Sequence, residues 1–535
     1  MQDKTIINFK SIKKYFINFF GLFLSLNFLI VAFFTSLNTK WNSDYVMLHV
    51  ISKEYFKSKI FFSADNFLIK MPIYYISTLT SGFSRESFFI ATFSFLSLTF
   101  LLLYIFYNKN KNKRNLNIYE FIPILYLINI GYFYNLLITS YRNFEIPLLF
   151  IIIFSLNKLN KLNIIMLISI LSIIFYSDPY YFYVIGIPYL LSAIFLAFKK
   201  KIDKNQMQIS ISVFFSILLS YVIRFISNKS GYFYIYDEAA SFVSFQQFLK
   251  NISSFFEVIL SMLSANFFGK QIFSVDGIFS LINLFFIILT IYGLTVSFSK
   301  GIKKNHLFDL FISQSLIITI AAYLFSVLVL IETSRYLILV FFLSIFLLRN
   351  AIIDIKKRSN SLATIIVLLG IFVSIFNFFT ISKQYFYYKP IRDEYPTNFY
   401  LIDNLIMNGV SYGFSGYWNS SVNTFLSDDR IKILQIICQS GKMTPFTWNM
   451  STKMYNYNYV GDTFLIYPLD TNPIEGVTAI DGNFFSGCNE KNIIDQFGEP
   501  KKTLNLSAEN RSWKVYIFNY NIYSKMSQDL TEIKF

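Results

Sequence analysis

Residues 16–36 read FINFFGLFLSLNFLIVAFFTS, an uncharged apolar stretch that is followed at once by the polar segment LNTKWNSD, which ends at Asp44. A helix needs roughly 20 apolar residues to cross the ~30 Å hydrocarbon core of a bilayer. The stretch is too long for a cleavable signal peptide and lacks a small-residue cleavage site. We therefore interpret it as a retained first transmembrane helix, with residues 1–15 on the cytoplasmic side.

The rest of the chain has the composition of a polytopic membrane protein. Of 535 residues, 54% are hydrophobic and only 15% are charged, too few charges to cover a soluble fold of this size. Disorder is excluded for the same reason. We predict eleven transmembrane helices, at 16–36, 87–107, 118–138, 144–157, 162–177, 180–198, 209–227, 277–298, 307–330, 336–348 and 361–380.

The distribution of Lys and Arg sets the predicted orientation. With the N-terminus inside, the cytoplasmic segments carry 21 Lys and Arg in 63 residues, whereas the outer loops carry 11 in 115. This is the bias that the positive-inside rule requires. The net charge of +16 is spread over these short clusters, so it does not indicate a nucleic-acid-binding face. With two Cys and two His in all, a Cys- or His-based metal site is not expected.

Residues 382–535 differ in pattern from the preceding 381 residues. Short alternating segments at 410–414, 431–438, 463–467 and 515–520 predict strands, and 398–407, 420–427 and 492–497 predict helices between them. The sequence thus predicts a small α/β domain outside the membrane, after a transmembrane domain (1–381) with a long first outer loop at 37–86. Cys438 and Cys488 both lie in this domain, where a disulfide could persist or two thiols could simply be buried.

Two aspartates of the first outer loop are candidate catalytic bases. Apolar residues recur at helical spacing over 45–61, which predicts an amphipathic helix at the membrane surface, with Asp44 at or just before its start. Ser43 or Asp44 would then cap that helix, which is a sufficient structural reason for a carboxylate here. The functional interpretation is a general base acting on an acceptor hydroxyl. Asp65, farther along the same loop, is the alternative base.

Three other outer segments carry acids or arginines. Asp178 precedes Pro179, and either caps a helix or contributes a catalytic carboxylate. Arg142 and Glu145 share a short turn, where they either pair with each other or bind substrate. Arg335, followed by Tyr336, lies on the predicted outer side, although most Lys and Arg lie on the inner side. Its guanidinium either binds a phosphate or lies at the membrane interface.

The order of these features resembles that of the GT-C glycosyltransferases, polytopic membrane enzymes that take sugars from polyprenyl-phosphate donors. A first helix is followed by a long outer loop with an early Asp, then by short central helices and an outer C-terminal domain. A bacterial branch of this superfamily is the closer likeness. It rests on short motifs at 177–179, 334–337, 412–418, 426–433, 497–500 and 513–518.

The resemblance implies an inverting transfer of a sugar from a polyprenyl phosphate to a glycan, lipid or protein outside the bacterial cytoplasmic membrane. It assigns the base to Asp44, although the acidic pair often found there is a single Asp in this chain. Asp178 would position hydroxyl groups, and Arg335, with Arg142, would stabilise the leaving phosphate. Trp418 is either a sugar-stacking residue or part of the core. No cofactor is expected, and a divalent cation between Asp44 and Asp178 is an open alternative.

Two competing functions fit the same topology. A non-enzymatic flippase or transporter of lipid-linked glycans would need ionisable residues along a path through the helices, and the predicted spans contain few. An envelope glycan assembly protein would use the outer domain to bind a partner. Only a measurement of activity separates these hypotheses from a glycosyltransferase.

Overall fold

The computed structural model describes residues 41–54, 60–62, 67–87, 89–91, 94, 161–230, 233–235, 242–326, 329, 332–385, 390–469, 484–509 and 511–526. The predicted spans at 16–36, 87–107, 118–138 and 144–157 lie wholly or mostly outside these residues. The chain forms two compact units, which we call the membrane unit (1–36, 93–224 and 238–387) and the loop–tail unit (37–92, 225–237 and 388–535).

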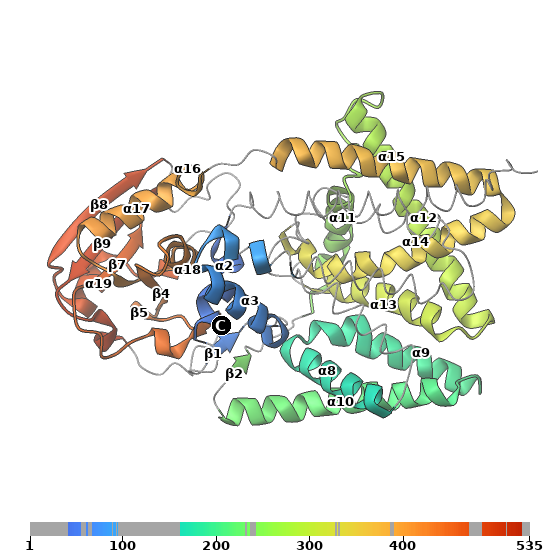
Figure 1. Ribbon diagram of the computed structural model, residues 1–535, viewed down its shortest axis with the longest axis horizontal. Coiled ribbons are helices and arrows are strands. Elements are labelled where there is room, and N and C mark those ends of the chain that lie inside the picture. The colour runs from blue at the N-terminus through green and yellow to red at the C-terminus, as the bar shows by residue number, and fades with distance from the viewer. Residues whose placement is uncertain are drawn as a thin grey trace, which may run out of the picture. The chain divides into compact units, whose positions relative to one another are not determined.

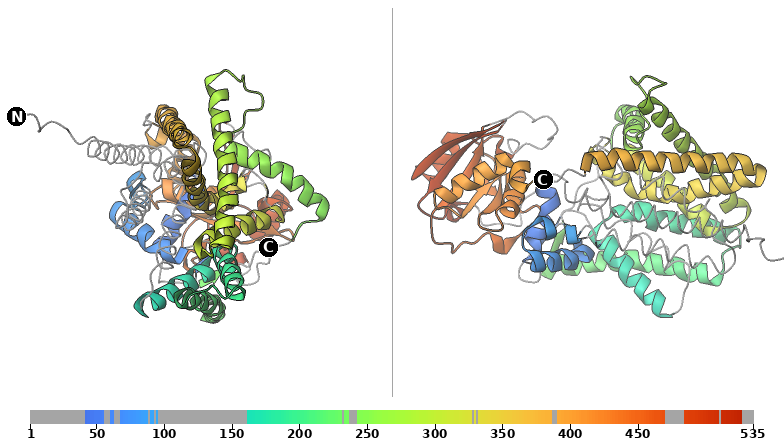
Figure 2. Two further views of the ribbon diagram at one scale, coloured as in Figure 1. Left: turned by 90° about the vertical axis from the view of Figure 1, so that its right-hand side faces the viewer. Right: turned by 45° about the horizontal axis from the view of Figure 1, so that its top comes forward.

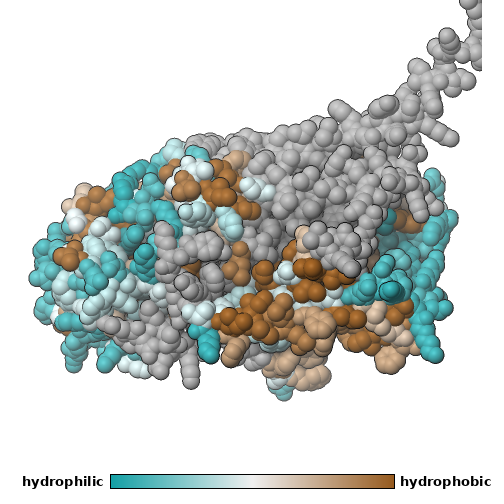
Figure 3. All heavy atoms as spheres, turned by 60° about the horizontal axis from the view of Figure 1, so that its bottom comes forward, coloured by the Kyte–Doolittle hydropathy of each residue, from teal (hydrophilic) through white to brown (hydrophobic). Residues whose placement is uncertain are grey.

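The membrane unit is helical throughout its described part (Figure 1). By length and composition, three of the described helices could cross a membrane, namely α10 (Lys204–Ser230), α12 (Val275–Lys303) and α13 (Leu307–Leu324). Figure 3 shows an apolar band on the outside of the molecule, as expected where lipid is the solvent. The other helices are α8 (Lys161–Ser177), η2 (Phe182–Gly186), α9 (Ile187–Phe198), α11 (Phe245–Met262), η3 (Glu332–Leu337), α14 (Ile338–Arg358) and α15 (Asn360–Tyr385).

Seven predicted spans coincide with helices of this unit, but some of these helices end at other residues than predicted. Helix α13 stops at Leu324, six residues before the predicted end. Helix α14 continues ten residues beyond its predicted apolar run, through Lys356, Lys357 and Arg358, whose positive charges lie favourably at a helix C-terminus. Figures 1 and 2 show α13, α14 and α15 packed alongside one another.

The loop–tail unit is built on a six-stranded mixed sheet in the order β5-β4-β3-β7-β9-β8. Strands β4, β3 and β7 run parallel in the middle, and the others pair antiparallel at the sides. The predicted strands and helices of the tail are confirmed as β3 (Tyr412–Ser415), β4 (Lys432–Gln439), β7 (Thr463–Pro468), β9 (Arg511–Phe518), α17 (Pro396–Met407), α18 (Tyr417–Leu426) and α19 (Glu490–Phe497). Three further elements were not predicted from the sequence, namely β5 (Lys442–Pro445), β8 (Lys502–Ala508) and the short helix α16 (Ile391–Glu394).

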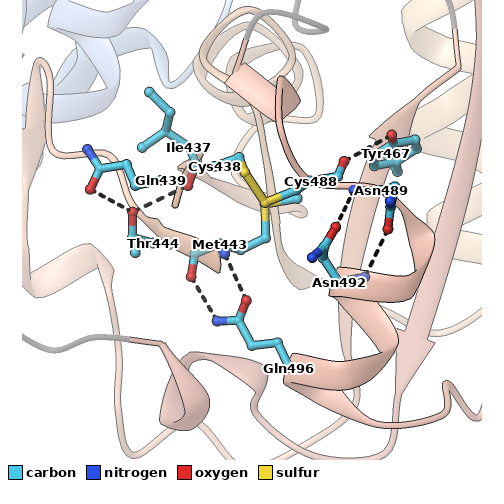
Figure 4. Close-up of a disulfide and its surroundings, with 10 residues drawn as sticks. All are labelled: Ile437, Cys438, Gln439, Met443, Thr444, Tyr467, Cys488, Asn489, Asn492 and Gln496. Atoms are coloured by element: carbon cyan, nitrogen blue, oxygen red, sulfur yellow. Dashed lines mark hydrogen bonds between the residues drawn. A yellow bond between two sulfur atoms is a disulfide. The ribbon is translucent and has the colours of Figure 1, made fainter. Parts of the chain in front are cut away.

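A disulfide between Cys438 and Cys488 joins the end of β4 to the segment before α19 (Figure 4). Around it, Tyr467 donates its hydroxyl to the carbonyl of Cys488, and the Gln496 amide pairs with both backbone groups of Met443. Of the two alternatives for these cysteines, the structure contains the bonded one.

The first outer loop folds together with the tail. Strand β1 (Ile60–Phe62) pairs in parallel with β2 (Phe233–Ile235) and antiparallel with β6 (Met450–Ser451), so one small sheet joins three distant parts of the chain. Helix α2 (Ser43–Ser52) packs against α18 and against α3 (Phe67–Ser81). The prediction of an amphipathic surface helix over 45–61 is therefore wrong: the helix ends at Ser52, and its neighbours cover it on more than one side.

Candidate functional site

Asp44 lies in the first turn of α2, but it does not cap the helix. The cap is Asn42, whose side chain accepts a hydrogen bond of 3.1 Å from the backbone N–H of Tyr45. The expectation that Ser43 or Asp44 would do this is wrong, because both side chains point to the tail instead. Ser43 donates its hydroxyl to the carbonyls of Tyr417 (2.7 Å) and Trp418 (3.1 Å).

The Asp44 carboxylate is held by the tail. The hydroxyl of Tyr417 donates a hydrogen bond of 2.5 Å to Asp44 Oδ1. Tyr417 is 3% exposed, whereas Asp44 is only partly buried. A short hydrogen bond to a charged acceptor is among the stronger ones in proteins, and here its donor is fixed by packing. The carboxylate is thus oriented, on a residue that is only partly buried.

The sheet topology places this contact where α/β folds commonly bind ligands. Strand β3 pairs in parallel with β4 on one side and with β7 on the other, so the strand order reverses at β3. Open α/β sheets bind ligands outside the carboxyl ends of the strands at such a switch point. Helix α18 begins directly after β3, with Gly416 as its N-cap, so Tyr417 stands at this edge.

Aromatic rings surround Tyr417 at the same edge. The ring centroids of Trp418, Phe446 and Phe484 lie 4.8, 6.4 and 6.3 Å from that of Tyr417. Phe446 is buried, whereas Trp418 and Phe484 are partly exposed. Trp418 thus packs against Tyr417 and is itself partly exposed. The packing fits a core residue, and the partial exposure fits a residue that stacks on a sugar.

His49, five residues after Asp44, is a structural residue. Its side chain is fully buried, and its Nδ1 lies 3.1 Å from the hydroxyl oxygen of Thr78 and 3.0 Å from that of Ser87. Burial lowers the pKa of the imidazole to about 3, so it is neutral at physiological pH. It therefore joins α2 to α3 and to the helical residues 85–87 as an uncharged hydrogen-bonding group.

A buried ion pair connects the same loop to the tail. Arg85 and Glu394 are in direct contact, and their side chains are 6% and 10% exposed. Next to it, the backbone N–H of Trp41 donates to the hydroxyl of Tyr395, and the two rings stack with centroids 5.8 Å apart. Burial and the Glu394 charge hold the pKa of Tyr395 above its usual range. Sequence reasoning missed this pair, because nothing local links positions more than 300 residues apart.

In the membrane unit, hydrogen bonds of Tyr180 connect two of the predicted site residues, Asp178 and Tyr336. Asp178 is 1% exposed, and its Oδ1 accepts a hydrogen bond of 3.0 Å from the backbone N–H of Tyr180, as expected of a cap before Pro179. Tyr180 in turn donates its hydroxyl to the carbonyl of Tyr336, which lies in η3. Asp178 thus fixes the turn whose tyrosine reaches the Arg335–Tyr336 segment.

For the other predicted site residues, the structure describes no side chain. Asp65, Arg142 and Glu145 lie outside the described residues, and of Arg335 only the backbone, in η3, is described. Within the described part of the chain, no three His, Cys, Asp or Glu residues gather as metal ligands would. The expectation that no cofactor is needed and the alternative of a cation shared by Asp44 and Asp178 both stay untested.

Comparisons with known proteins identify no relative, since neither a protein-family model nor a curated protein matches the chain. The resemblance to GT-C glycosyltransferases therefore stays a hypothesis. It has to be judged on the chemistry of the residues themselves.

Proposed function

We propose that the protein is a membrane glycosyltransferase that moves a sugar from a polyprenyl phosphate to a hydroxyl group of a glycan, lipid or protein outside the cytoplasmic membrane of a bacterium. The observation that carries the proposal is the Asp44 carboxylate, which belongs to a partly buried residue and is oriented by Tyr417 at the switch point of the tail sheet. The proposal includes eleven spans, a cytoplasmic N-terminus and an outer C-terminal domain.

In the proposed reaction, the acceptor oxygen attacks the anomeric carbon of the donor sugar and gives its proton to Asp44. The bond between that carbon and the phosphate oxygen breaks, and polyprenyl phosphate leaves with the electron pair. Attack from the opposite face inverts the anomeric configuration. A positioned base contributes typically 10²–10⁴-fold to such a step.

The remaining residues have supporting roles in the proposal. The guanidinium of Arg335, with that of Arg142, neutralises the phosphate that leaves. Asp178 is a positioning residue, because its carboxylate fixes the turn that carries Tyr180 to the Arg335–Tyr336 segment. Trp418 offers the exposed part of its ring to a sugar, and Asp65 and Glu145 contribute hydrogen bonds to substrate hydroxyls. The apolar helices contact the polyprenyl chain.

The test measures free polyprenyl phosphate released by purified protein from a panel of polyprenyl-phosphate sugars, with simple alcohols and glycans as acceptors. We compare wild type, Asp44→Asn and the control Asp403→Asn, which removes an exposed carboxylate of α17 in the same unit. The amide introduced by Asp44→Asn keeps an oxygen to accept the Tyr417 hydrogen bond, so the fold should survive. We expect release to fall at least 100-fold in Asp44→Asn and to be unchanged in the control.

Two results would count against the proposal. Equal release by wild type and Asp44→Asn would exclude Asp44 as the base and direct attention to Asp65. No release by wild type from any donor, together with movement of a lipid-linked sugar across proteoliposomes, would favour a transporter over an enzyme.

A further inference from the structure

Helix α11 of the membrane unit has three distinct faces. Its inner face, formed by Asn251, Val258 and Met262, is buried against the unit. A second face is apolar and exposed. A third is polar and exposed. A helix with one apolar face normally buries that face, so two unlike exposed faces on the same helix require an explanation.

The inner face fixes where α11 lies. The Asn251 side-chain amide donates to the backbone carbonyls of Leu324 (2.8 Å) and Ser326 (2.9 Å), at the C-terminus of α13. The backbone N–H of Val243 donates to the carbonyl of Phe325 (3.1 Å), and Phe248 stacks on the Phe325 ring with centroids 4.4 Å apart. These bonds satisfy carbonyls that the last turn of a helix leaves without partners.

The contact with the C-terminus of α13 indicates the depth of α11 in a membrane. Helix α13 is one of the three described helices that are long and apolar enough to cross a bilayer, and we take its C-terminus to lie at a membrane surface. Figure 1 shows α11 crossing the direction of α13 and α15. A helix that lies across the end of a membrane-spanning helix is at the depth of the lipid headgroups.

The two exposed faces occupy residues 245–257 of the helix, which ends at Met262. Phe245, Leu249 and Phe256, at spacings of four and seven residues, form the apolar stripe and are 71%, 52% and 61% exposed. The polar stripe lies about 100° farther round the helix and consists of Gln246, Lys250, Ser253 and Glu257, all exposed. The polar stripe has one positive and one negative side chain, so its net charge is zero.

We propose that α11 lies in the plane of the membrane interface, with the Phe245–Leu249–Phe256 stripe in contact with lipid acyl chains and the Gln246–Glu257 stripe in contact with water. Such an arrangement is that of a monotopic amphipathic helix, here attached to a polytopic protein. Two further phenylalanines are exposed in the flanking segments, Phe242 (80%) before α11 and Phe268 (71%) six residues after its end. Because the polar stripe is neutral, contact with lipid should not depend on anionic headgroups.

The proposal is independent of the proposed function, since it concerns the contact of one helix with lipid and would hold for an enzyme or a transporter. The chain also offers a clean way to test it. Its two cysteines are bonded to each other, so a cysteine introduced into unreduced protein is the unique thiol available for labelling.

The experiment uses four variants of the full chain, each carrying one fluorescent label, in lipid nanodiscs. Leu249→Cys and Phe256→Cys report on the apolar stripe, and their sequence neighbours Lys250→Cys and Glu257→Cys are the matched controls on the polar stripe. Quenching is measured with a lipid that carries a nitroxide in its acyl chain and, separately, with iodide in the water. Nanodiscs of zwitterionic lipid and of mixed anionic lipid are compared.

We expect the lipid nitroxide to quench labels at 249 and 256 several-fold more than labels at 250 and 257, and iodide to show the reverse order, in both lipid mixtures. Equal quenching by iodide at all four positions would place α11 in water and overturn the proposal. Equal quenching by the nitroxide would place it within the hydrocarbon and also overturn it. Protection of 249 and 256 from both quenchers would mean that protein covers the apolar stripe, which contradicts the proposal as well.

Discussion

Helix α10 of the membrane unit and strand β8 of the tail sort their side chains in opposite directions. In α10, Ser212, Ser216 and Ser220 are buried at intervals of four residues, whereas Phe214 and Phe215 are about half exposed. Ser216 donates its hydroxyl to the carbonyl of Ile168 in α8 (3.4 Å), so a small polar residue of the buried face contacts a neighbouring helix.

In β8, the apolar side chain of Leu506 is buried, and its polar neighbours Asn505 and Ser507 are exposed. Both patterns have the same physical cause, because apolar side chains are placed in apolar surroundings, either the protein core or lipid. For β8 these surroundings are the core of the loop–tail unit. Helix α10 is long and apolar enough to cross a membrane, so its exposed phenylalanines suit contact with lipid, and four of its six buried residues are serines.

The largest loss of stability is expected when a buried charge inside the loop–tail unit loses its partner. We expect Arg85→Ala to lower its free energy of unfolding by about 3–5 kcal/mol, because a nearly buried carboxylate, Glu394, loses its counter-charge. The control is Arg392→Ala, which breaks an exposed pair with Asp403 and should cost at most about 1 kcal/mol. Thermal unfolding of the purified variants measures both. Equal losses would show that the Arg85–Glu394 pair is not buried.

The second test introduces a charge on the outside of each unit. Phe214 in α10 and Tyr457 in the tail are 51% and 52% exposed. The two side chains are therefore equally exposed, and the test asks whether one faces lipid and the other water. Phe214→Lys should cost about 2.5–3.5 kcal/mol, the typical penalty for a lysine facing hydrocarbon. Tyr457→Lys should stay within about 0.5 kcal/mol of wild type. Stability in nanodiscs is the measurement, and a tolerated Phe214→Lys would contradict lipid contact at α10.

The third test uses the buried imidazole of His49. Its pKa is lowered to about 3, whereas it is near 6.5 in an unfolded chain, so between these pH values only the unfolded state binds the proton. Stability is therefore complete above pH 6.5 and is lost as the pH falls, by about 2 kcal/mol at pH 5. His49→Gln should remove this part of the acid sensitivity. Melting temperatures at pH 7.5 and 5.0 test it, and an unchanged difference in the variant would contradict the assignment.

The smallest effect on stability is expected at the candidate site. Tyr417→Phe removes the hydrogen bond to Asp44 and should cost about 1 kcal/mol. If the proposed function is correct, the variant should also release polyprenyl phosphate more slowly, because the base is no longer oriented. Tyr417→Phe combined with Asp44→Asn should add little further loss of activity. Full additivity of the two changes would show that Tyr417 does not act through Asp44.

Patterns local in the sequence predicted the tail well. Strands β4 and β9 are long runs of alternating or fully buried residues with turn residues at their ends, and such patterns depend only on neighbours in the chain. Helices α10 and α12 were found for a similar reason, since a long apolar run leaves few alternatives. The position of Asp44 in the first turn of a helix was also readable, although the capping residue, Asn42, was missed by one to two positions.

What the sequence did not reveal depends on contacts between distant segments. The bond from Tyr417 to Asp44 spans 373 positions, and no periodicity marks either residue. Strands β1 and β6 have three and two residues, too short for a recognisable alternation. Helix α2 looked amphipathic because its partners, α3 and α18, could not be foreseen, and they cover the surface that was predicted to meet lipid.

The distance between the first loop and its partners in the tail also has a consequence for biosynthesis. Trp41 bonds to Tyr395, 354 positions later, so the loop leaves the ribosome long before the segment that completes its core. At 5–20 residues per second, the interval is roughly 20–70 s. Throughout that time, the apolar residues of α2 lack their neighbours in α18, although α3 is already made. A nascent chain truncated before residue 390 should therefore expose this loop to protease, and the complete chain should protect it.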